Sequence, residues 1–213
     1  MRGLGNKHLG VALLVVLGIA GGADLVVSRS LLAQEAPAQG TTADFTQEQA
    51  MEPLAWLVGD WEGEGWIQQG PQEGRAEFTQ TEHVESAFGG RLLLVEGVGR
   101  AKPSAGDAAS PEAGSIVHHA YGVLSWDLED AEYDFDTYLA DEAGVDADAT
   151  LEDGLLTWSF ETGEGQIRFR IRQTEQGEWH EKGEFSPDGT TWYPFFEMTL
   201  HRAGEAPASE GNR

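Results

Sequence analysis

The sequence contains no cysteine among its 213 residues. This absence excludes disulfide bonds, a thiolate metal site, a cysteine nucleophile and a lipid-modified N-terminal cysteine. Basic side chains are also scarce, since 13 Lys and Arg stand against 37 Asp and Glu and give a formal net charge of −24. A nucleic-acid backbone is bound by clustered cations. We therefore expect no nucleic-acid partner, and an anionic lipid surface is disfavoured for the same reason.

The sequence motifs of several enzyme classes are missing too. There is no Gly-x-Ser-x-Gly elbow, no phosphate-binding loop and no His-Glu-x-x-His pair. The acidic stretch 127–148 lacks the glycine and glutamate spacing of an EF-hand loop, so we expect a solvated surface there. No sequence motif therefore points to catalysis or to a metal site.

The N-terminal segment is typical of an export signal. Arg2 and Lys7 precede the apolar run 9–20, and small residues follow it at 21–23. The run is shorter than the roughly 20 residues of a membrane span. We expect residues 1–38 to hold a signal peptide, or alternatively an uncleaved anchor, and the start of a linker. The folded part would then be periplasmic or extracellular, with no transmembrane segment beyond that anchor.

Composition divides the remainder into three parts. Residues 39–50 are small and polar and predict a flexible linker. Residues 51–202 have the size of one domain, and residues 203–213 predict a disordered tail. Within the domain, 102–114 is rich in Ala, Ser, Gly and Pro and is expected to be a surface loop. One short helix is expected within 46–57, where Pro53 limits its length.

Beyond this helix the hydrophobic period is two, which is typical of half-buried strands. Ile167, Phe169 and Ile171, for example, alternate with three arginines. Nine strands are predicted, at 61–67, 76–84, 91–99, 115–126, 132–140, 155–160, 167–172, 178–185 and 192–202. Short connections make neighbouring strands antiparallel. The chain is therefore all-β, and a closed barrel is favoured over a two-sheet sandwich because closure removes unpaired edges.

Two segments at the ends of this domain carry a family resemblance. Residues 54–65 contain the pattern Gly59-x-Trp61-x-Gly63-x-Gly65, and residues 186–202 form a terminal aromatic hairpin. Together they resemble the nitrobindin-like heme-binding β-barrel family and its bacterial relatives in the calycin superfamily, which includes lipocalins and fatty-acid-binding proteins. The resemblance implies an antiparallel up-and-down barrel of about nine to ten strands with a short N-terminal helix.

The same resemblance assigns structural roles at the closed end of the barrel. Trp61 would fill the floor, while Gly63 and Gly65 would let the first strand bend. By analogy with calycins, Arg202 of the last strand would pack over the Trp61 ring as a cation–π contact. We expect Gly59, Trp61, Gly63, Gly65 and Arg202 to hold the barrel closed rather than to bind a ligand.

Strands rich in large apolar side chains would line an interior pocket. The predicted lining is Trp66, Phe78, Glu82, Leu94, Tyr121, Tyr138, Trp158, Phe169 and Phe196. Glu82 and Glu197 are ambiguous, because each either points inward with a raised pKa or faces solvent. The arginine stripe at 168, 170 and 172 is expected on the outer face, where it would balance acidic neighbours.

Histidine is the residue through which nitrobindins hold heme, so a heme cofactor is an alternative. His201, in the last strand, is a weak candidate ligand, since alternation places it opposite Phe196 and Met198. His118 and His119 are adjacent on one strand and therefore face opposite sides. His83 and His180 lie among carboxylates and are expected to face solvent.

Three functional hypotheses remain open. The first is an exported, non-enzymatic barrel that binds a small hydrophobic or amphipathic ligand. The second is a nitrobindin-type heme protein that acts on nitric oxide or peroxynitrite. The third is an envelope scaffold that docks another protein. The sequence does not determine the oligomeric state.

Overall fold

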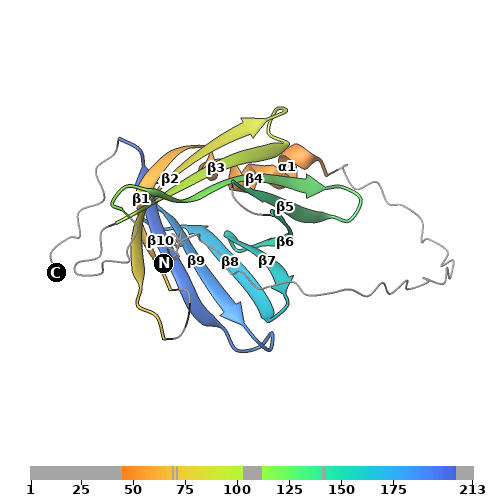
Figure 1. Ribbon diagram of the computed structural model, residues 1–213. Coiled ribbons are helices and arrows are strands. Elements are labelled where there is room, and N and C mark those ends of the chain that lie inside the picture. Colours follow the sequence, from red (N-terminus) through yellow and green to blue (C-terminus); the bar gives the residue numbers. More distant parts are fainter. Residues whose placement is uncertain (1–44, 69, 71, 103–111, 141–142, 205–213) are drawn as a thin grey trace, which may run out of the picture.

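The computed structural model describes residues 45–68, 70, 72–102, 112–140 and 143–204. Ten antiparallel strands close into one barrel, in the order β1-β10-β9-β8-β7-β6-β5-β4-β3-β2 (Figure 1). The strands are β1 (Gly59–Ile67), β2 (Ala76–Ala87), β3 (Leu92–Ala101), β4 (Ile116–Asp127), β5 (Glu132–Leu139), β6 (Val145–Glu152), β7 (Leu155–Thr162), β8 (Gly165–Gln173), β9 (Trp179–Ser186) and β10 (Tyr193–Arg202). The predicted calycin-like all-β barrel is confirmed.

The alternation in the sequence determines which side chains face the interior. On β8, Ile167 and Ile171 are buried and share their face with Phe169. The arginines between them point outward, and Arg168 and Arg170 pair there with Glu184 of β9 at 2.7 and 3.9 Å. The outer arginine stripe is therefore found where the period of two places it.

One strand was not among the nine predicted. In β6 the inward residues Ala147 and Ala149 are small, and they alternate with the exposed Asp146 and Asp148. Alanine alternating with aspartate gives only a weak hydrophobic period of two, and both residues have low β propensity. The segment is a strand because β5 and β7 pair with it on both sides.

A short helical segment covers one end of the barrel. It consists of α1 (Gln47–Met51) and the 3-10 helix η1 (Glu52–Leu57). Thr46 caps α1, and Tyr133 of β5 donates a hydrogen bond from its hydroxyl to the carbonyl of Ala50. Since Ala50 is buried, the folded unit begins inside the range 39–50 that composition predicted as linker.

Several other predictions concern segments outside the described residues. They are the signal or anchor of 1–38, most of the loop of 102–114 and the tail beyond Gly204. In the part of the chain that the structure describes, no helix combines the length and the apolar character needed to span a membrane.

The closed end of the barrel is built around Trp61. Its ring makes edge contacts with Trp56 and Trp179, at centroid distances of 5.9 Å each. The Arg202 guanidinium lies 3.9 Å from the Trp61 ring centroid and donates hydrogen bonds to the carbonyls of Val58 and Trp56. The arginine therefore joins the last strand both to the first strand and to the helical cap.

Gly63 and Gly65 let β1 approach its neighbours closely. A Cβ atom at Gly63 would lie 2.1 Å from the carbonyl oxygen of Thr199, and one at Gly65 would lie 2.5 Å from the Phe78 ring. Gly59 adopts a φ of +128°, which disfavours any other residue, and a side chain there would also meet Arg202.

Candidate functional site

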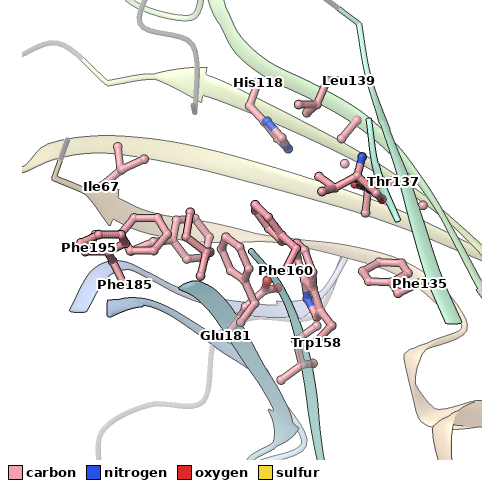
Figure 2. A pocket seen from close by; sticks show the side chains of 18 of the residues that line it. Ile67, His118, Phe135, Thr137, Leu139, Trp158, Phe160, Glu181, Phe185 and Phe195 are labelled. Carbon is pink, nitrogen blue, oxygen red and sulfur yellow. Dashed lines mark hydrogen bonds between the residues drawn. The ribbon is translucent and has the colours of Figure 1, made fainter. Parts of the chain in front are cut away.

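The interior of the barrel contains a cavity of about 1200 Å³. It extends from Leu57 and Trp179 near the capped end to Gly70, Gly163 and Pro187 in the loops at the other end. Figure 2 shows side chains entering this space from opposite walls, with His118 on one side and Glu181 on the other. A cavity of this size accommodates a small organic molecule.

One wall of the cavity is a continuous set of aromatic rings. Trp158 of β7 stacks on Phe169 of β8 at a centroid distance of 4.3 Å and on Phe160 at 6.0 Å. Phe169 in turn contacts Phe196 of β10 edge-on at 5.7 Å. Such rings offer flat apolar surface together with the negative faces of their π systems.

Trp158 contributes one polar atom to this wall. Its indole Nε1 is completely enclosed and, of the completely enclosed side-chain polar atoms described, it alone has no hydrogen-bond partner. Buried polar groups are almost always paired, so this unpaired N–H is an exception within the wall.

Glu82 and Gln80 lie in the interior wall, and each is opposite a glycine of β3. Oε1 of Glu82 accepts a hydrogen bond of 2.7 Å from Nε2 of Gln80, two residues earlier on β2. Gly97 and Gly99 of β3 leave the space that these two side chains occupy, since a Cβ at Gly97 would lie 2.7 Å from Oε1 of Glu82. Burial raises the pKa of Glu82 from 4.5 to about 7, and the Glu96 charge adds to this effect.

A second interior carboxyl belongs to Glu181 of β9. Its Oε2 accepts a hydrogen bond of 3.2 Å from Nε1 of Trp179. Burial raises its pKa from 4.5 to about 8, and repulsion from Glu82 contributes to this shift. Two acids with different neighbours thus titrate near neutrality inside one cavity.

His118 of β4 also faces the cavity, whereas its neighbour His119 faces outward and contacts Glu96 at 3.0 Å. Burial lowers the pKa of His118 from 6.5 to about 4, and the charge of His119 acts in the same direction. The interior imidazole is therefore neutral at pH 7. Within the described ranges, no group of three or more His, Asp or Glu is arranged to hold a metal ion.

Five of the residues predicted from sequence come together around the cavity, namely Glu82, Tyr121, Trp158, Phe169 and Phe196. Phe78 is also on the inner face, but its ring stacks on Phe196 at 5.6 Å and is buried in the core beside the cavity. The sequence left open whether Glu82 points inward or faces solvent, and in the structure its side chain points inward.

The structure corrects three other positions, Trp66, Leu94 and Tyr138, which are outside the cavity lining. Trp66 lies beneath the Arg75 guanidinium, which is 3.5 Å from its ring, and Leu94 is 38% exposed. Tyr121 and Tyr138 are a cross-strand pair and are 50% and 56% exposed. Tyr121 itself borders the cavity as predicted, although its side chain is half exposed and its hydroxyl contacts Glu96 on the outer face. Each has the opposite parity to the inward residues of its strand.

Two further candidates also lie outside the cavity. Of the two orientations considered for Glu197, the structure shows the outward one, in which its carboxylate pairs with His180 at 2.9 Å. His201 contacts the carbonyl of Arg202 through Nδ1 and is not part of the cavity lining. An iron ligand at His201 would therefore not reach an interior heme.

Sequence reasoning missed Gln80, His118 and Glu181 as lining residues. Glu181 had a usable signal, because Trp179 and Phe185 share its parity on β9. Gln80 shares the face of Phe78 and Glu82 in the same way. Apart from Glu82, only large apolar and aromatic side chains were expected to mark an inner wall, so other polar residues were not selected.

Comparison with known proteins adds information on the fold. No family model and no curated protein sequence matches this chain. The structure is similar to the crystal structure of Rv2717c from M. tuberculosis, with a TM-score of 0.50 and 15% sequence identity. The match covers 72% of this chain and 96% of that one. At this identity the likeness concerns the fold alone, and it agrees with a calycin-like barrel.

Proposed function

We propose that this protein binds a small apolar or amphipathic molecule inside its barrel. The observation that carries the proposal is the cavity of about 1200 Å³ with its wall of Trp158, Phe160, Phe169 and Phe196. An empty apolar cavity of this size forgoes the dispersion contacts that a packed core gains. A ligand that fills the cavity restores those contacts, and its own apolar surface is transferred out of water. The place of action proposed from the sequence is the periplasm or the extracellular space.

A neutral fluorescent probe, N-phenyl-1-naphthylamine, tests this function. We expect saturable binding at one site, with an emission increase as the probe leaves water. Ala120→Trp should weaken binding at least about tenfold, since Ala120 lines the cavity and the indole would occupy it. Tyr138→Trp, on the outer face of the neighbouring strand β5 and outside the cavity lining, is the matched control and should bind as the wild type does. Unsaturable binding by the wild-type protein would contradict the proposal.

Heme is the second candidate, and His118 is the observation that favours it. A neutral, cavity-facing imidazole can coordinate iron, whereas His201 lies outside. The two propionates fit less well, because the described cavity lining contains no Lys or Arg to pair with them. Titration with hemin should give a Soret shift that His118→Ala abolishes and His201→Ala leaves intact. No shift in the wild-type protein would remove this candidate.

A further inference from the structure

The charged and titratable groups of the cavity are almost all of one kind. The described lining holds Glu82, Glu161, Glu164 and Glu181, together with the neutral His118, and it holds no Lys or Arg. The carboxylate of a fatty acid would therefore find no cation to pair with and would be repelled by ionised glutamates. The overall charge of −24 acts in the same sense, since it attracts cations and repels anions.

Each interior carboxyl has a hydrogen-bonding position left over. Glu82 and Glu181 are more than nine-tenths buried, at 8% and 7% exposure. Glu82 uses Oε1 for its bond with Gln80, and Glu181 uses Oε2 for its bond with Trp179. The second oxygen of each, Oε2 of Glu82 and Oε1 of Glu181, has no hydrogen-bond partner among the residues that the structure describes. Both side chains line the cavity, and Figure 2 shows Glu181 directed into it.

Resting on the binding function proposed above, we propose that the ligand is an apolar amine, a molecule with an aliphatic or aromatic body and one protonated nitrogen, bound at the Glu82 and Glu181 carboxyls. An ammonium group donates hydrogen bonds and carries the charge that the cavity lacks. The aromatic wall of Trp158 and Phe169 suits both parts of such a ligand, since it is apolar and its ring faces attract cations.

Binding of a cation is linked to the protons of these carboxyls. The titratable groups that face Glu82 and Glu181 are each other and His118, while Glu96 acts on Glu82 from the outer face of β3. Their pKa values of about 7 and about 8 mean that both are largely protonated at pH 6 and largely ionised at pH 9. An ammonium ligand favours the ionised forms, so the displaced protons pass to the solvent. Its affinity therefore rises with pH between these limits.

Three probes with the same alkyl chain separate charge from hydrophobicity, namely decylamine, decanol and decanoate. We measure their binding by isothermal titration calorimetry at concentrations below self-association, in about 0.15 M salt to screen the acidic exterior. At pH 9 decylamine should bind about tenfold more tightly than decanol, and decanoate most weakly. At pH 6 the advantage of decylamine over decanol should shrink severalfold. Two buffers of different ionisation enthalpy should reveal proton release on decylamine binding near pH 7.

The double variant Glu82→Gln with Glu181→Gln tests the assignment to these residues. It keeps the shapes of both side chains and should bind decylamine and decanol within about twofold of each other, with decanol binding retained. The matched control, Glu62→Gln with Glu152→Gln, changes two exposed carboxyls on the outer face and should keep the wild-type preference. If the double variant does not fold, the pH and proton-release measurements on the wild-type protein still test the inference.

The possible failures are distinguishable. If decanol or decanoate binds as tightly as decylamine at pH 9, the amine inference is overturned while interior binding stands. If the control variant loses the preference as the cavity variant does, the amine binds to the exterior and the inference is again overturned. If none of the three probes binds saturably, the proposed binding function itself fails.

Discussion

Gly97 on β3 lies directly opposite Glu82 on β2, and its missing side chain leaves the space that the Glu82 carboxyl occupies. A Cβ atom at position 97 would lie 2.7 Å from one carboxyl oxygen and 2.8 Å from the other. A buried acid and a glycine on the neighbouring strand therefore form one structural unit. Any larger residue at 97 must displace the carboxyl.

Gly97→Ala should consequently destabilise the protein by about 1–3 kcal/mol through overpacking. Urea unfolding followed by tryptophan fluorescence measures this. Gly74→Ala is the control, because a Cβ there has no neighbour within 4 Å, and it should change stability by less than about 0.5 kcal/mol. The cost at position 97 should fall in a Glu82→Ala background. An equal cost in both backgrounds would mean that the carboxyl is not what the new methyl group meets.

Stability should fall as pH rises through neutrality, because of Glu82 and Glu181. Their pKa values are about 7 and about 8 in the folded protein, against an ordinary value of 4.5 in the unfolded chain. Above pH 4.5 the unfolded chain releases protons that the folded protein retains, so stability declines. It levels off once both carboxyls are ionised in the folded state, above about pH 9.

The double variant Glu82→Gln with Glu181→Gln isolates this effect from that of the many surface acids. Since one pKa unit corresponds to about 1.4 kcal/mol, the variant should gain about 2 kcal/mol or more relative to the wild type between pH 5 and pH 9. The free energy of unfolding is measured by denaturant titration at each pH. A stability difference that does not change with pH would contradict the assignment.

Replacing Arg202 should loosen the closed end of the barrel. Arg202→Ala removes the cation–π contact with Trp61 and two hydrogen bonds to the carbonyls of Val58 and Trp56. We expect a loss of about 2–4 kcal/mol. Arg91→Ala, which breaks only the exposed pair with Glu48, should cost less than about 1 kcal/mol. Similar losses in the two variants would show that Arg202 acts only as a surface charge.

The outer face of β5 and β6 places like charges opposite each other. Asp134 pairs across the strands with Asp148, and Asp136 with Asp146. Desolvation and the surrounding aspartates raise the pKa of Asp134. Because directly opposed like charges destabilise a sheet, Asp148→Asn should increase stability by about 0.5 kcal/mol.

Added salt provides the check on this prediction, since it screens repulsion between exposed charges. The gain from Asp148→Asn should shrink as ionic strength rises. Glu152→Gln, opposite Leu155 on β7, has no such repulsion to relieve and is the control. A gain that persists in high salt would indicate a cause other than charge.

The sequence predicted the barrel because most strands bury apolar residues at every second position. Ile167, Phe169 and Ile171 show this on β8, where the alternation correctly predicted which side chains point into the barrel. It failed on β6, where alanine and aspartate alternate and strand pairing rather than local propensity determines the structure. Leu94 was misplaced for a related reason, because a run of apolar residues from 92 to 95 has no visible parity.

The candidate site was harder to predict than the fold. Large aromatic residues were taken as lining, which succeeded for Trp158 but failed for Trp66, whose place between Gly65 and Ile67 gives it the outer parity. Glu181 was not selected because acids are rarely buried, although Trp179 and Phe185 share its parity on β9. Its position follows from its neighbours on other strands, and pairing register is a property of the folded chain.

Closure of the barrel also constrains the order in which the chain gains its structure. The hydrogen bond from Arg202 to Val58 joins residues 144 positions apart, and β1 meets β10 along its length. The first strand therefore has one of its two partners only after the last has emerged from the ribosome. Such distant pairing slows folding, and until it forms, the row of backbone amides on β1 that β10 will cover is open to solvent and to other chains.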